Sequence, residues 1–254
     1  MRYLGQYSIL MVTPLTGSLV RRSAAFGRRL HYSGSCFVTG VKKSPAPRST
    51  NVYVDGFNLY YGCVKDTPYK WLNIAELCRL SLPAHYQIHR IRYFTALVKP
   101  RPSDPFQDVR QQTFIRALQT LPDFSVHYGE FLQSEVRMHL AHPPAKGATT
   151  ALVVKTEEKG SDVNLATYLL MDAYEHDFEV AIVISDDSDL AEPIKIVRRR
   201  LKHNVTVLSP RGKSRTLSMA STKFWQITAA NLAASQFPPT LTDTNGTITK
   251  PATW

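Results

Sequence analysis

Aspartates follow two apolar segments of the sequence and open a predicted helix. Asp55 comes directly after VYV, and Asp187 and Asp189 come just after the apolar run AIVIS. Asp162 follows KGS at the start of the predicted helix. Because the carboxyl ends of parallel strands meet at one edge of a sheet, where ligands bind, we expect these four side chains to converge.

Each of these aspartates also has an ordinary structural explanation, since Asp is a good helix cap and a frequent turn residue. Four carboxylates at one sheet edge are a different matter, because like charges repel and are tolerated chiefly when a cation lies among them. Hard oxygen ligands without His or Cys favour Mg²⁺ or Mn²⁺ over zinc. Such ions activate water and stabilise the charge that develops during displacement at a phosphodiester. We expect Asn58 to join the site, because a neutral amide orients a phosphate or a water without adding repulsion.

The elements that must position these residues alternate between strands and helices from residue 51 onward. The segment EVAIVIS is a continuous apolar run, typical of a strand covered on both faces of a parallel sheet. Further strands are predicted at 88–97, 125–132, 151–158 and 204–210, and helices at 74–80, 107–121 and 190–202. The apolar face of the 107–121 helix includes Val109 and Phe114. This alternation predicts an α/β fold of three layers, with a mainly parallel central sheet between two layers of helices.

The positive charge of the chain is concentrated at its start. The net charge is +11, but residues 1–50 hold eight of the 31 Lys and Arg and none of the 20 Asp and Glu, which leaves +3 for residues 51–254. Three interpretations of residues 1–50 stay open: an organellar transit peptide, a wrongly assigned start, or a disordered basic arm that touches nucleic acid. Residues 51–237 are predicted to form one domain, and residues 238–254, rich in Pro and Thr, a flexible tail.

Cysteine usage and hydropathy predict a cytoplasmic protein without a membrane role. Cys36, Cys63 and Cys78 form no CxxC pair and are odd in number, which argues against a disulfide framework or a zinc knuckle. The segment YSILMVTPL is too short to cross a bilayer, because spanning takes about twenty apolar residues.

Basic and aromatic side chains outside the acidic cluster are candidates for binding a nucleic acid. Arg211, Lys213 and Arg215 lie in a loop that follows a predicted strand, where phosphate binding and simple solvation are nearly even alternatives. The cations of residues 198–202 lie at the end of a predicted helix, where they suit the negative pole of the helix dipole. Trp71 can stack on a base or pack in the core.

Three segments of the sequence together resemble the signatures of NYN domains, the LabA-like branch of the PIN-like nucleases. They are VYVDGFNLYYG at 52–62, KGSDVNLATYLLMDAY at 159–174 and VAIVISDDSDLAEPIKIV at 180–197, in the order that the family shows. The resemblance covers residues 51–237 and implies a PIN-like fold and a metal-dependent ribonuclease activity on RNA. It assigns the metal-facing acids to Asp55, Asp162, Asp187 and Asp189, with Asn58 beside them.

Two positions depart from the pattern of that family. Asp186 stands where the family usually has Gly or Asn, which adds a carboxylate beside the site. Thr167 lies where many members carry a further acid, so we expect a site of four acids, which leaves open whether one or two metal ions bind. Asp172 lies farther along the same predicted helix and is expected at the surface.

Two alternative functions can be weighed against this one. A non-catalytic or weakly active RNA-binding regulator would keep the same fold and acids, and a cleavage assay separates it from a nuclease. A haloacid-type phosphatase needs a second acid two residues after its nucleophilic Asp, whereas Phe57 stands two residues after Asp55, which argues against this class. The oligomeric state is left open, and a homo-oligomer is compatible with the sequence.

Overall fold

The centre of the molecule is a six-stranded sheet in which all neighbouring strands run parallel. The computed structural model describes residues 45–254, so residues 1–44, with the three interpretations of the basic segment, lie outside the described residues. The strand order is β3-β2-β1-β6-β7-β8. The strands are β1 (Arg48–Asp55), β2 (Tyr86–Thr95), β3 (Phe124–Tyr128), β6 (Val180–Ile184), β7 (Asn204–Ser209) and β8 (Lys223–Gln226). The predicted α/β class with a mainly parallel sheet is confirmed.

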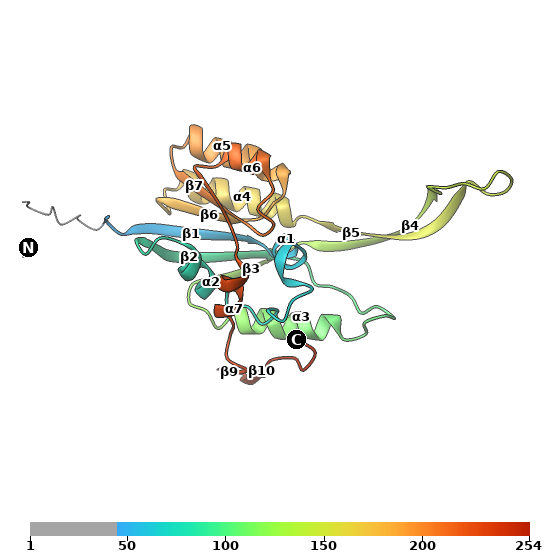
Figure 1. Ribbon diagram of the computed structural model, residues 1–254, viewed down its shortest axis with the longest axis horizontal. Coiled ribbons are helices and arrows are strands. Elements are labelled where there is room, and N and C mark those ends of the chain that lie inside the picture. Colours follow the sequence, from blue (N-terminus) through green and yellow to red (C-terminus); the bar gives the residue numbers. More distant parts are fainter. Residues whose placement is uncertain (1–44) are drawn as a thin grey trace, which may run out of the picture. The chain divides into compact units, whose positions relative to one another are not determined.

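Helices cover both faces of this sheet (Figure 1). One face carries α4 (Ser161–Tyr174), α5 (Ala191–Arg199) and α6 (Arg215–Ala220). The other carries α2 (Ile74–Ser81), α3 (Gln107–Leu118) and α7 (Ala229–Ala234), together with α1 (Gly56–Leu59) and the π-helical turn η1 (Tyr60–Val64) that follow β1. These are the three layers that the alternation of elements predicts.

The side chains of β1 divide between the two cores, because successive residues of a strand point to opposite faces. Val52 and Val54 pack in the core beneath α2 and α3, whereas Tyr53 packs in the core beneath α4. Asp55 has the same parity as Tyr53, so β1 delivers it toward the α4 face. All five residues of β6 are buried, as expected for a continuous apolar run inside a parallel sheet.

Several element boundaries differ from the prediction by two or more residues, among them the start of β1 and the end of α3. The first strand begins at Arg48, whose N–H donates to the His85 carbonyl at 2.7 Å, and Thr50 is fully buried. The polar residues at this end of β1 gave no hydrophobic signal, so the predicted boundary at residue 51 lies inside the strand. Helix α3 ends at Leu118, and Val109 is 55% exposed instead of packing in the core.

Strands β4 (Glu130–His139) and β5 (Thr150–Lys159) form an antiparallel hairpin of their own. The hairpin extends beyond the end of the central sheet (Figure 1). The single strand predicted at 125–132 is divided at Gly129 into β3 and β4. At this residue the chain passes so close to β5 that a Cβ would lie 2.5 Å from the carbonyl oxygen of Lys159. A glycine therefore permits the close crossing at which the chain leaves the sheet.

The C-terminal segment is folded, in contrast to the flexible tail expected from its composition. Strands β9 (Thr240–Asp243) and β10 (Gly246–Thr249) form a second hairpin. The Asp243 carboxylate accepts hydrogen bonds of 2.7 and 2.6 Å from Arg116 of α3, and the rings of Trp254 and Trp71 lie 6.3 Å apart. The flexible tail was predicted from the Pro and Thr content of this segment. The segment also contains an Asn-Gly turn between alternating apolar and polar residues, which is a strong hairpin signal.

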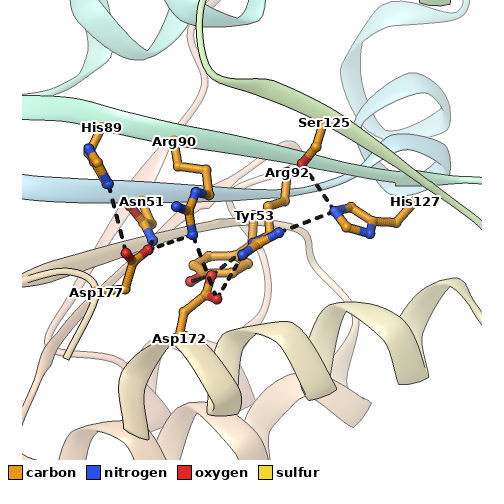
Figure 2. Close-up of polar contacts among 9 residues, drawn as sticks. All are labelled: Asn51, Tyr53, His89, Arg90, Arg92, Ser125, His127, Asp172 and Asp177. Atoms are coloured by element: carbon orange, nitrogen blue, oxygen red, sulfur yellow. Dashed lines mark hydrogen bonds and ion pairs between the residues drawn. The ribbon is translucent and has the colours of Figure 1, made fainter. Parts of the chain in front are cut away.

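A buried ion pair joins α4 to the sheet (Figure 2). Asp172, expected at the surface, is only 1% exposed. Its carboxylate accepts two hydrogen bonds of 2.8 Å from Arg92 and one of 2.7 Å from the Tyr53 hydroxyl. Burial and the Asp172 charge both raise the pKa of Tyr53. The surface prediction was wrong because the partner of Asp172 lies on a different element, where the helical pattern alone does not reveal it.

The same network also holds the loop that follows α4. Asp177 accepts hydrogen bonds from Arg90 at 2.8 Å and from the Asn51 side chain at 2.7 Å. The Arg92 guanidinium lies over the Tyr168 ring, 4.6 Å from its centroid, so the C-terminal half of α4 is fixed to β1 and β2. This matters for the site, because α4 begins with the segment that carries Asp162.

None of the helices in residues 45–254 is long and apolar enough to cross a membrane. Cys63 and Cys78 are free thiols, and Cys36 lies outside the described residues. Burial raises the pKa of each of the two thiols to about 12, which makes them poor nucleophiles at neutral pH.

Candidate active site

The acidic residues gather where the order of the sheet reverses. Strands β1 and β6 are neighbours, but the chain leaves β1 toward β2 on one side and leaves β6 toward β7 on the other. Val54 pairs with Ile184, so Asp55 and Ser185 follow side by side at the carboxyl edge. Such a switch point is the usual place for a ligand in an open α/β sheet, because the two diverging loops leave a crevice.

Asp55 is fixed by the turn that it begins. Its Oδ1 accepts a hydrogen bond of 2.9 Å from the Asn58 N–H and thereby caps α1, and its Oδ2 accepts one of 2.9 Å from the Ser185 hydroxyl. The side chain is nearly buried, with 5% exposure. Burial raises the pKa of Asp55 to about 6, although these two hydrogen bonds oppose the rise.

Asp187 is held by the same serine. The Ser185 oxygen accepts a hydrogen bond of 3.0 Å from the Asp187 N–H while its hydroxyl donates to Asp55, so one buried serine links the ends of β1 and β6. Asp187 in turn caps the short helix η2 (Ser188–Leu190), because its Oδ1 accepts a hydrogen bond of 3.0 Å from the Asp189 N–H. Asp189 itself is exposed at the rim of the turn.

Asp162 occupies the first turn of α4 and makes no side-chain hydrogen bond within residues 45–254. Its pKa is raised to about 6, first by burial and next by the negative charges of Asp55 and Asp187. Asp189 adds a smaller contribution of the same sign. Asp162 therefore lies near enough to the other three aspartates to be affected by their charges, although the four residues come from three separate segments.

Glu158 is a fifth acid that the sequence analysis missed. Its Oε1 accepts hydrogen bonds from the Ser161 N–H at 3.1 Å and the Ser161 hydroxyl at 2.7 Å, which caps the start of α4. Its charge contributes to the raised pKa values of both Asp55 and Asp162. The available signal was an acid a few residues before a helix start, a position where carboxylates bind free N–H groups.

Asn58 and Asp186 organise the turn from its other side. The Asn58 side-chain oxygen accepts a hydrogen bond of 3.0 Å from the Asp186 N–H, which ties α1 to the end of β6. The Asp186 carboxylate accepts from the Ser209 hydroxyl and, at 2.7 Å, from the Arg211 N–H. Asp186 therefore supports the loop after β7, and this explains the extra carboxylate without a role as a metal ligand.

The basic residues divide into structural and exposed ones. Arg211, Lys213 and Arg215 are exposed and form no ion pair with another residue of the range 45–254. Arg198 instead donates to the carbonyls of residues 219–221 at the end of α6, so its role is structural. Trp71 is fully buried and donates to the Pro238 carbonyl at 2.8 Å, which places it in the core.

The donor set fits a hard divalent cation by charge and by ligand type. Neighbouring carboxylates contribute to the raised pKa values of Asp55 and Asp162, and a cation among them would relieve that repulsion. As the side chains stand, no three His, Cys, Asp or Glu residues within the described range form a group that could hold a metal ion. The fit therefore rests on the chemistry of the acids and not on a formed coordination shell.

A family model, a curated protein and a solved structure match this chain. The NYN domain family model matches residues 49–228. The chain is 30% identical over 242 residues to 6-hydroxy-3-succinoylpyridine 3-monooxygenase from Pseudomonas putida, covering 84% of this chain and 77% of that protein. A crystal structure of a protein of unknown function from Vibrio parahaemolyticus matches with a TM-score of 0.48 and 18% identity, over 74% of this chain and 97% of that one. This chain is therefore a member of the NYN domain family, within the PIN-like nuclease superfamily.

Proposed function

We propose that this protein is a ribonuclease that hydrolyses RNA phosphodiester bonds at the acidic edge of its sheet, with the help of Mg²⁺ or Mn²⁺. The proposal is supported by the position of Asp55 and Asp187 after neighbouring strands at the switch point of the sheet, and by the charge effect of nearby aspartates on Asp162. Membership of a nuclease superfamily supports it. No side-chain nucleophile is required, because metal-assisted hydrolysis uses water.

The four aspartates have two kinds of role in this proposal. Asp55 and Asp187 are held by caps and by Ser185, so each presents its carboxylate in a fixed direction. Asp162 and Asp189 make no side-chain hydrogen bonds within residues 45–254, so their oxygens are free to accept a ligand. A divalent ion bound by these carboxylates supplies a water of lowered pKa and positive charge for the phosphoryl oxygens.

The phosphate backbone of the RNA would be held by the loop that follows β7. Arg211, Lys213 and Arg215 are exposed there, and Asp186 fixes the start of this loop to the acidic turn. Cations beside a hydrolytic centre position the strand without reading its sequence. The proposal therefore predicts little base specificity from this loop.

The test is cleavage of a labelled single-stranded RNA by the full chain in millimolar Mg²⁺ or Mn²⁺, with EDTA as the blank. Asp162→Asn should lower the rate by about a hundredfold or more, because the variant loses one of the carboxylates proposed to hold the divalent ion. A hundredfold loss corresponds to about 3 kcal/mol of transition-state stabilisation. This substitution is isosteric and removes no hydrogen bond seen in the structure. Asp66→Asn, at an exposed site whose side chain makes no hydrogen bond or ion pair within residues 45–254, is the matched control.

Two results would contradict the nuclease proposal. Equal rates for wild type and Asp162→Asn would mean that the cleavage comes from a contaminant or from another site. Binding of RNA without metal-dependent cleavage would instead support the alternative of a non-catalytic RNA-binding regulator. Thermal melting of both variants shows whether a lost activity reflects a lost fold.

A second candidate function follows from the relative in Pseudomonas putida, whose name describes oxygenation of a substituted hydroxypyridine. Identity of 30% over most of both chains makes a related activity on a small hydroxylated heterocycle a specific alternative. The test is oxygen uptake and substrate loss with 6-hydroxy-3-succinoylpyridine and a two-electron reductant. Turnover there, with no cleavage of RNA, would replace the nuclease proposal.

A further inference from the structure

The hairpin of β4 and β5 stands alone as a two-stranded ribbon. Its strands pair over ten residues each, from Glu130 opposite Lys159 to His139 opposite Thr150. Within residues 45–254 no third strand joins it, so each strand keeps one edge of unpaired N–H and C=O groups. An isolated two-stranded ribbon is marginally stable in water, and open edges readily accept another strand.

The surface of this hairpin suits a protein partner better than a nucleic acid. Leu132, Met138, Leu152 and Val154 are 48 to 60% exposed, an unusual concentration of apolar side chains for the surface of a monomer. Residues 130–159 contain four Asp or Glu and four Lys or Arg, so the hairpin carries no net charge. Because affinity for nucleic acid depends on positive charge, RNA is a poor match for this surface.

The sequence of β4 is complementary to a second copy of itself. In an antiparallel pair of strands, the side chains of opposite residues point to the same face of the sheet. When the two strands are identical and related by a two-fold axis, one residue must therefore lie on the axis, opposite its own copy. With Val136 on the axis, Glu135 faces Arg137 of the second copy, and Arg137 faces its Glu135. Centring the pair on residue 135 or 137 would instead place like charges opposite each other, which is destabilising.

The register centred on Val136 also sorts the remaining side chains by face. Residues 132, 134, 136, 138 and 140 share the face opposite to the two ion pairs. Leu132 would meet Leu140 of the second copy, and Ser134 would meet Met138. The apolar residues of β4, with Leu140 directly after it, therefore form one strip across both copies, while the charged pairs occupy the other face.

The edge of β5 is less suited to this pairing, because its charges already have partners. Lys155 and Glu157 form an ion pair of 2.5 Å, and Glu158 caps α4 through Ser161. Glu135, in contrast, makes neither an ion pair nor a side-chain hydrogen bond within the described residues.

We infer that a second copy of this chain binds along the open edge of β4, in antiparallel register centred on Val136, to form a two-fold symmetric dimer. The pairing converts two isolated hairpins into one four-stranded ribbon. The inference does not depend on the proposed nuclease function, because no residue of the acidic site takes part in it.

The test is sedimentation velocity or light scattering of the full chain over a concentration series. Wild type should dimerise, and Glu135→Arg should weaken the dimer by about tenfold or more, because two symmetric ion pairs become like-charge pairs. Arg137→Glu should do the same, and the double exchange Glu135→Arg with Arg137→Glu should restore dimerisation. Lys155→Glu on β5 is the matched control and should leave the dimer unchanged.

A disulfide provides a second readout that does not depend on charge. Val136→Cys should form a covalent dimer under mild oxidation, because only a residue on the axis meets its own copy within disulfide range. Val154→Cys on β5 should stay monomeric on a non-reducing gel. A monomeric wild type, a dimer that ignores both charge reversals, or a double exchange that stays dissociated would each overturn the inference. A wild type that is monomeric and loses RNA binding on Arg137→Glu would assign the hairpin to RNA instead.

Discussion

Replacing Asp172 by Asn should cost this protein a large part of its stability. The carboxylate is 1% exposed and accepts three hydrogen bonds, two from Arg92 and one from Tyr53. Removing one partner of a buried ion pair typically costs about 3–5 kcal/mol, because the other charge is left uncompensated. The Arg92 side chain keeps 12% exposure and Asn keeps one acceptor, so we expect the lower end, about 3 kcal/mol. For a domain of this size that corresponds to a fall in Tm of roughly 6–12 °C.

The assay is urea unfolding of the full chain followed by tryptophan fluorescence, with Asp66→Asn as the exposed control, which should change stability by less than about 0.5 kcal/mol. A double-mutant cycle sharpens the test. Arg92→Gln combined with Asp172→Asn leaves no buried charge, so the double variant should be about 1–3 kcal/mol more stable than the sum of the two single losses predicts. A loss below about 1 kcal/mol for Asp172→Asn, or additive single effects, would refute this account of the network.

Three other predictions concern Asp162, the loop that follows β7 and the C-terminal hairpin. The raised pKa of Asp162, about 6, means that its ionised form opposes folding. In EDTA, the stability advantage of Asp162→Asn over wild type should therefore be largest at pH 7 and disappear below about pH 4, as measured by urea unfolding. Asp186→Gly removes the acceptor for the Arg211 N–H, so hydrogen exchange at that amide should quicken, whereas unchanged protection would mean that other contacts hold the loop. Removing residues 238–254 exposes Trp71 and should lower Tm by about 4 °C or more, whereas a tail that contributes nothing would leave it unchanged.

The sequence was sufficient to predict what depends on local pattern. The continuous apolar run around β6 predicted a buried central strand, and the polar residues after β1 and β6 predicted the edge at which the acids meet. Asp55 and Asp187 were visible because they follow apolar strands directly. Asp162 was visible because Asp after Gly and Ser is typical of a helix start. Each inference needed only neighbours in the chain and the general rule for parallel sheets.

What the sequence could not predict depends on partners that are distant in the chain. Asp172 is buried because Arg92 lies on a strand 80 residues away, and helical spacing contains no trace of that contact. Glu158 joins the acidic site because Gly129, which has no side chain, lets the chain before β4 pass close to the end of β5, a contact that the local sequence does not reveal. The C-terminal hairpin is the exception, because its Asn-Gly turn is a local signal that predicts a hairpin. The Pro and Thr content of the same segment led instead to the prediction of a flexible tail.

The contact between β1 and β6 also determines when the acidic site can exist. The Ser185 hydroxyl reaches Asp55 across 130 residues of chain, and Asp162 and Asp187 are made long after Asp55. During synthesis, Asp55 therefore leaves the ribosome without its partners, and the carboxylates remain apart until β6 has been made and has inserted beside β1. Contacts of such long range form slowly and together with the rest of the fold. An unfinished chain that ends before β6 lacks the site altogether, so whatever chemistry the four aspartates perform belongs to the completed protein.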